Sequence, residues 1–168
     1  MGGHAQEDKH AAHHRLAARL SQQAEDVRRL TAGLDETALA ERTVAGKWSL
    51  KELVCHLWRV QQVFEGRVDK MLSEDVPAIA SWEPDGDTEF ERMAARPGNE
   101  CVRSFLAARE RFLTRLETLS PSEWHRRGSH PEYPNYDVHF QIDYMVHHEA
   151  HHIYQMFQRR LPFGKLPH

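Results

Sequence analysis

The sequence predicts an all-α protein that folds as a four-helix bundle. Four long stretches carry apolar residues at spacings of three, four and seven, which is the period of an amphipathic helix. No stretch alternates apolar and polar residues as a half-buried strand does. Hydrophobic residues make up 40% and charged residues 28% of the 168 residues, a balance typical of a globular protein. We therefore expect a single domain over residues 1–168, with one core between the helices.

The first half of the chain contains two of these long helices. An amphipathic pattern runs over residues 10–30 and is followed by a loop over 34–47 that has room for one helical turn. Ser49 and Glu52 have the spacing of a capping box, in which each side chain accepts a hydrogen bond from the backbone N–H of the other residue. The second long helix is therefore expected to begin here and to cover residues 50–71.

The second half is expected to contain a long connection and the remaining helices. Three prolines and several acidic residues lie within 76–97, which indicates a surface connection with at most a short helix at 88–94. Apolar spacing predicts the third long helix over 99–119. A Ser-Pro-Ser-Glu segment predicts one short turn at 120–124, and an Asp cap begins the last helix at 137–161.

Charge and hydropathy exclude several functional classes. The net charge is −3, and basic residues are mixed with acidic ones, so we expect no nucleic-acid partner. No apolar run approaches the roughly 20 residues of a membrane span, and the first twenty residues lack the apolar stretch of a secretory signal. These patterns predict a cytoplasmic protein without membrane association. Cys55 and Cys101 are accordingly expected to be reduced thiols.

Histidine is unusually frequent, with 13 residues that cluster near the two ends of the chain. The first cluster is His10, His13 and His14, and the second is His147, His148, His151 and His152. Clustered imidazoles are typical of metal binding. The first cluster lies near a chain terminus among small and charged residues, so we expect its side chains to be exposed.

The phase of the last helix distinguishes two possible ligand pairs. His148 and His152 are four residues apart and share one face, and so do His147 and His151. At 100° per residue, the first pair lies about 100° from the centre of the apolar face, whereas the second lies about 160° away. The first pair is therefore expected to border the core and the second to face water.

His56 has a similar position on the second long helix, at the edge of its apolar stripe. Three neutral imidazoles, from His56, His148 and His152, would make a three-ligand metal site with an open coordination position, as catalytic Zn²⁺ sites have. The competing interpretation is a metal-free bundle in which these histidines are hydrogen-bonded or solvated.

Residues 148–152 also match His-Glu-x-x-His, the zinc-metalloprotease motif in which Glu149 would be the general base. We discount this interpretation because those enzymes add a third ligand downstream, and Gln158 occupies the short-spacing position here. By phase, Glu149 falls near the centre of the apolar face, so it must find a buried partner: an imidazole, an Arg or a water. It remains the best candidate for a catalytic proton carrier or a group that supports a ligand.

Two segments of the chain resemble the DinB/YfiT-like superfamily. Residues 48–57, Trp-Ser-Leu-Lys-Glu-Leu-Val-Cys-His-Leu, resemble its Trp-Ser-x-x-Glu-x-x-x-His-Leu segment, and residues 148–155 resemble its closing His-x-x-x-His-x-x-Gln segment. The resemblance implies a metal-binding four-helix bundle with a long connection between the second and third helices, and often a homodimer. Carried over by position, it implies His56, His148 and His152 as the metal ligands. Tyr154 stands where many members have Gly.

The resemblance also implies two kinds of enzyme acting on a small-molecule substrate. Some members resemble metal-dependent hydrolases, and others are thiol transferases or isomerases that use bacillithiol, mycothiol or glutathione. A metal-bound hydroxide or thiolate would be the nucleophile in either case. Three imidazoles suit Zn²⁺, Ni²⁺, Fe²⁺ and Cu²⁺ alike, and of these we expect Zn²⁺ or Ni²⁺. The alternative function is a non-catalytic stress-response or interaction module whose metal only stabilises the bundle.

Overall fold

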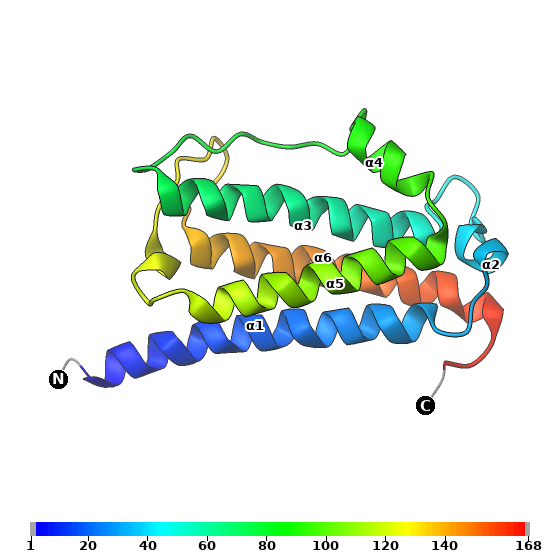
Figure 1. The fold of residues 1–168 in the computed structure, drawn as a ribbon, viewed down its shortest axis with the longest axis horizontal. Helices are drawn as coiled ribbons and strands as arrows, with labels where there is room; N and C mark the ends of the chain where they lie inside the picture. Colours follow the sequence, from blue (N-terminus) through cyan, green and yellow to red (C-terminus); the bar gives the residue numbers. More distant parts are fainter. Residues whose placement is uncertain (1–2, 167–168) are drawn as a thin grey trace.

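The computed structural model describes residues 3–166 and confirms the all-α class (Figure 1). The described residues contain no strand and only two isolated β-bridges. The helices are α1 (Gly3–Thr31), α2 (Glu36–Ala40), α3 (Leu50–Ser73), α4 (Thr88–Ala94), α5 (Gly98–Thr118) and α6 (Val138–Arg160), with short 3₁₀ helices η1 (Glu123–His125) and η2 (Leu161–Phe163). The main difference from the predicted bounds is the start of α1, which is earlier, and the helical turn α2 lies within the loop where one was expected.

Local side-chain caps fix the starts of the helices that carry the site. Ser49 and Glu52 form the predicted capping box, with hydrogen bonds of 3.1 and 2.8 Å, and Asp137 caps α6. The start of α5 differs, because Pro97 has no capping side chain. The carboxylate of Glu36, on α2, accepts hydrogen bonds from the first two backbone N–H groups of α5 instead.

The four long helices form a bundle in which α1 and α3 each pack against both α5 and α6. Figure 1 shows α1 and α6 running in one direction and α3 and α5 in the other. Because α3 and α5 are parallel and consecutive, the chain must return along the length of the bundle between them. Residues 74–97, including α4, make this return, which confirms the predicted long connection.

Backbone hydrogen bonds join this long connection to the loop before α6. Ile79 N donates to Ser129 O, and Ser129 N donates to Pro77 O, both at 2.8 Å. The two segments approach closely at Gly128, where a Cβ would lie 2.7 Å from the Ile79 side chain. Glycine is therefore needed here for packing. Together the two segments supply part of the site described below.

One buried ion pair in the core joins the four long helices. Arg109, on α5, is fully buried, and its guanidinium donates to both carboxylate oxygens of Glu149, to Gln61 Oε1 and to Leu20 O. Each donor and acceptor of the pair has a partner, as buried charges require. No helix in residues 3–166 is long and apolar enough to cross a membrane.

Candidate metal centre

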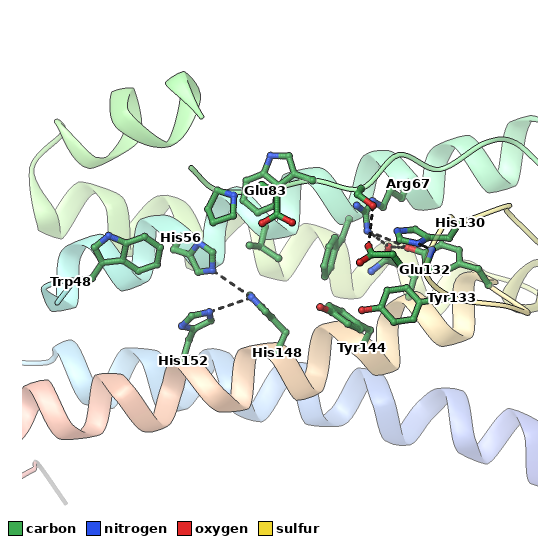
Figure 2. A pocket seen from close by; sticks show the side chains of 17 residues that line it. Trp48, His56, Arg67, Glu83, His130, Glu132, Tyr133, Tyr144, His148 and His152 are labelled. Atoms are coloured by element: carbon green, nitrogen blue, oxygen red, sulfur yellow. Dashed lines mark hydrogen bonds between the residues drawn. The ribbon is translucent and has the colours of Figure 1, made fainter. Parts of the chain in front are cut away.

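The structure brings together the three histidines to which the sequence pointed. Nε2 of His148 lies 3.4 Å from Nε2 of His56 and 3.2 Å from Nε2 of His152 (Figure 2). One ring nitrogen from each of the three residues lies within 4.8 Å of the others. His56 comes from α3 and the other two from α6, one helical turn apart. Two neighbouring helices therefore direct three imidazoles at one point.

The helix phase of α6 is as predicted. His147 and His151 are exposed, whereas His148 and His152 are partly buried at the edge of the core. His56 is only 3% exposed. The histidines that border the core are thus the ones that converge.

Both the charge state and the spacing of the cluster fit a metal ion. Burial, together with the neighbouring histidines, lowers the pKa of His56 to about 3 and that of His148 to about 4, and burial lowers the pKa of His152. The imidazoles are therefore neutral, which is the form that binds a metal. Nitrogens bound at about 2.0 to 2.1 Å in a tetrahedral site lie about 3.3 Å apart, and the two separations here are 3.4 and 3.2 Å.

One of the three imidazoles has a side-chain partner at its other ring nitrogen. Nδ1 of His152 lies 2.8 Å from Oε1 of Gln155, so Nδ1 carries the proton and the Nε2 lone pair faces the cluster. Nδ1 of His56 and of His148 is buried and has no hydrogen-bond partner among the described residues. Gln155 is therefore the orienting side chain that the structure identifies.

Aromatic rings cover the cluster on the side of the long connection. The centroid of the Trp48 ring lies 4.9 Å from that of His56, and the Trp82 ring lies 6.3 Å from it. Asp87 holds Trp82 in place, because its carboxylate accepts hydrogen bonds from Trp82 Nε1 and from the Arg59 guanidinium. Arg59 is also the main reason that the pKa of Asp87 falls to about 2. The sequence pattern did not predict that these residues belong to a site.

A cavity of about 340 Å³ opens beside the three histidines. Figure 2 shows Trp48 and the three clustered histidines on one side of the cavity, and Arg67, His130 and Tyr133 on the other. This volume lies within the range of small-molecule sites, about 300 to 1,000 Å³. Its lining mixes aromatic and polar side chains: Trp48, His56, Val60, Phe64, Arg67, Ser81, Trp82, Glu83, Pro84, His130, Glu132, Tyr133, Tyr136, Gln141, Tyr144, His148 and His152.

The match to the DinB superfamily covers residues 19–156, which make up well over half of the chain. The chain belongs to the DinB superfamily. YuaE, an uncharacterized protein of Bacillus subtilis (strain 168), is 25% identical over 140 residues, which cover 74% of this chain and 84% of YuaE. The resemblance inferred from the two sequence motifs is therefore confirmed.

A solved structure shares the fold of this DinB superfamily member. It is YfiT from Bacillus subtilis, described as "a probable metal-dependent hydrolase with an unusual four-helix bundle topology". The TM-score is 0.76 at 18% sequence identity, and the match covers 90% of this chain and 87% of YfiT. The likeness shows that the two proteins have the same bundle architecture.

In this DinB superfamily protein, Glu149 is buried but does not line the cavity. Of the three partners that the sequence left open, the structure shows Arg. Both of its carboxylate oxygens are bound by Arg109, so the geometry gives Glu149 a structural part in the core. Its role as a proton carrier stays a prediction from the sequence.

The expectation for the first histidine cluster was wrong at His13. His10 and His14 are exposed, but His13 is only 3% exposed and stacks on Trp124 with ring centroids 4.5 Å apart. Trp124 lies on η1, far from α1 in the sequence, so the spacing of the histidines alone does not reveal this contact. Cys55 and Cys101 are free and buried thiols, as expected.

Proposed function

We propose that this protein is a metal-dependent enzyme that acts on a small electrophilic substrate. His56, His148 and His152 would hold one divalent cation, with Zn²⁺ or Ni²⁺ the best candidates and Fe²⁺ or Cu²⁺ also compatible. The observation that carries the proposal is that three ring nitrogens converge beside a cavity of about 340 Å³. The description of YfiT as a probable metal-dependent hydrolase supports the same reading.

A divalent cation at this position supplies a Lewis acid, which makes a hydroxide or a thiolate available near neutral pH. The protein residues provide the surroundings for that chemistry. Trp48 and Trp82 shield the histidines from water, and Gln155 fixes the ring of His152. Hydrolysis and transfer of a low-molecular-weight thiol both fit this arrangement, and no residue near the cavity selects between them.

The alternative is a non-catalytic module in which the metal only stabilises the bundle. A structural site has four protein ligands, whereas a catalytic site keeps one position for water or substrate. The described residues offer three His, Cys, Asp or Glu side chains at this point. The combination of three ligands with an adjacent cavity favours the enzyme.

The first experiment is elemental analysis of the untagged protein and of two ligand variants. We expect about one equivalent of metal per chain, lost in His56→Ala and His148→Ala. His147→Ala is the matched control, because His147 lies next to His148 on α6 but is exposed. If the protein holds no metal after incubation with Zn²⁺ or Ni²⁺, the proposal fails.

A second experiment distinguishes the two reactions. The metal-loaded protein is incubated with an electrophilic aryl halide and either bacillithiol, mycothiol or glutathione, and separately with an activated ester. Thiol-dependent turnover that His148→Ala abolishes supports transfer, and ester hydrolysis that the same variant abolishes supports a hydrolase. Full metal occupancy without turnover in either assay would favour the non-catalytic module.

We also propose that the protein forms a homodimer, as the family resemblance implies. Tyr154, Phe157 and Leu161 are large apolar residues at helical spacing near the end of α6, and they are 61%, 39% and 57% exposed. Tyr154 therefore points away from its own chain, where it does not disturb packing. Light scattering on the wild type and on a Tyr154→Lys, Leu161→Lys double variant tests this, because the double variant should be monomeric.

A further inference from the structure

The cavity has a second polar end, away from the three histidines. Figure 2 shows His148 and His152 at one end, Tyr144 and Tyr133 further along, and Arg67 and His130 at the other end. The rings form a continuous series, with centroids 6.3 Å apart for His148 and Tyr144 and 5.7 Å apart for Tyr144 and Tyr133. An occupant that reached both ends would thus lie along aromatic side chains.

Arg67 brings a positive charge to this second end that no acidic residue neutralises. Among the side chains of residues 10–166, no carboxylate oxygen forms an ion pair within 4.0 Å of its guanidinium. Its hydrogen bonds go to neutral oxygens: Ala80 O at 2.8 Å, the Tyr136 hydroxyl at 3.4 Å and Gln141 Oε1 at 3.5 Å. A partly buried guanidinium whose hydrogen-bond partners are all neutral can still bind an anion.

Gln141 supplies a second donor without an acceptor. Its side chain lines the cavity and is 0% exposed, yet its Nε2 has no hydrogen-bond partner among the described residues. The orientation of the amide is fixed, because Oε1 accepts from Arg67, which can only donate. A buried N–H without an acceptor is rare in folded proteins and calls for an explanation such as a ligand. Gln141 therefore lacks an acceptor and Arg67 lacks a negatively charged partner, and one anion would supply both.

The neighbouring groups leave this place open to an anion. Glu83 and Glu132 line the cavity but are exposed, and Glu132 accepts a hydrogen bond from Ser81 at 2.9 Å. Burial raises the pKa of Tyr136 and of Tyr144, so both hydroxyls stay protonated; Tyr136 donates to Gln141 Oε1, and the hydroxyl of Tyr144 is a further donor. His130 lines the same end, where its ring stacks on Tyr136.

We infer that this end of the cavity binds the carboxylate of an organic acid, with Arg67 and Gln141 as its donors. The planar guanidinium matches a carboxylate, and the aromatic series from Tyr133 to His148 suits an unsaturated or aryl body. As a statement about the substrate, the inference rests on the proposed function, because it places the reactive part of the acid at the three histidines. The carboxylate belongs either to the electrophile or to a thiol co-substrate.

Tryptophan fluorescence measures binding directly, because Trp48 and Trp82 line the cavity. The probes are 4-phenylbutyrate and its neutral amide, titrated into metal-loaded protein. We expect the acid to bind at least about tenfold more tightly than the amide. Arg67→Met should abolish this preference and Gln141→Leu should reduce it. Arg92→Met removes an equal charge from an exposed helix face, where the Arg92 side chain is 79% exposed, and should leave the preference intact.

Equal binding of acid and amide to the wild type would overturn the inference, and so would a preference that survives in Arg67→Met. Tight, Arg67-dependent binding of phenyl phosphate with no binding of the acid would also overturn it. Arg67-dependent binding of glutathione without binding of 4-phenylbutyrate supports the carboxylate site and assigns it to the thiol.

The outcome is separable from that of the proposed function. His148→Ala should lose the metal yet keep the preference for acid over amide, because Arg67 and Gln141 lie at the other end of the cavity. A wild-type protein that binds no metal but still prefers the acid would therefore refute the enzyme and retain the carboxylate site. A wild-type protein that binds metal but does not prefer the acid would refute the carboxylate site and retain the enzyme.

Discussion

The bundle contains two histidine clusters, and they use the same side chain in opposite ways. At one, His56, His148 and His152 direct ring nitrogens at a common point beside a cavity of about 340 Å³. At the other, His13 of α1 lies flat on Trp124, with 6° between the ring planes, and its Nδ1 is 3.0 Å from Nδ1 of His139. This group, the His13 cluster, consists of His13, His125 and His139, and the cavity next to it has a volume of only about 10 Å³.

The difference teaches what turns clustered histidines into a candidate site. At the His13 cluster, imidazoles serve as packing and hydrogen-bonding groups: His13 pairs with His139, and His125 pairs with Asp137 at 3.3 Å. At the three-histidine cluster, the Nε2 atoms meet one another and adjoin open space. Convergence of lone pairs next to a cavity, more than the number of histidines, therefore marks a place for a metal.

The largest loss of stability should come from breaking the buried ion pair that joins α6 to the core. Arg109→Met leaves the Glu149 carboxylate buried without a counter-charge, and we expect a loss of about 3 to 5 kcal/mol in the free energy of unfolding. An Arg109→Met, Glu149→Leu double variant should recover much of that loss, because no charge then remains buried. Urea unfolding measures both. A change below about 1 kcal/mol in the single variant would contradict the structural role of the pair.

The second prediction is that low pH removes the contribution of His13 to stability. Burial, with smaller contributions from His139, His125 and His10, lowers the pKa of His13 to about 4, and Asp137 opposes the shift. An unfolded histidine titrates near 6.5, so the unfolded state takes up this proton first as the pH falls. The contribution of His13 to stability is therefore complete above pH about 6.5 and is lost as the pH falls toward 4.

His13→Phe keeps a ring on Trp124 but cannot titrate. Between pH 6.5 and 4, the wild type should lose up to about 2 kcal/mol more stability than this variant. Thermal or urea unfolding across the pH range tests the difference. Parallel curves for the two proteins would show that His13 does not stay neutral in the folded state.

Local patterns in the sequence predict much of this fold and part of the site. The Ser49 and Glu52 capping box sets where α3 begins, and the phase of α6 separates His148 and His152 from their exposed neighbours. Such features depend on residues a few positions apart, so they can be read from one segment at a time.

Features that depend on distant segments could not be predicted in this way. Trp124 buries His13, and Arg109 takes the carboxylate of Glu149, across 40 positions in the sequence. Arg67 illustrates the same limit, because its hydrogen-bond partners come from the long connection and from α6. Helix phase tells which face of a helix is covered, but it does not tell which side chain covers it.

A smaller effect, on metal affinity, is expected from Gln155, which orients His152 in the three-histidine cluster. Gln155→Leu removes the acceptor for Nδ1 of His152, and we expect metal affinity to fall about tenfold. The control is Gln158→Leu, because Gln158 lies on the same helix but is exposed. Competition with a chromophoric chelator measures both affinities. Equal affinities in the two variants would mean that Gln155 does not orient the ligand.

The smallest expected change is in the metal content of His139→Ala, which should equal that of the wild type. His139 donates to or accepts from the buried His13, so its removal should cost about 1 kcal/mol of stability. It should cost no metal, because Nδ1 of His13 is paired with Nδ1 of His139 and the cavity beside this cluster has a volume of only about 10 Å³. Elemental analysis and urea unfolding of the same preparation give both values. A loss of metal in His139→Ala would show that the His13 cluster also binds a cation, and the contrast between the clusters would then be one of degree.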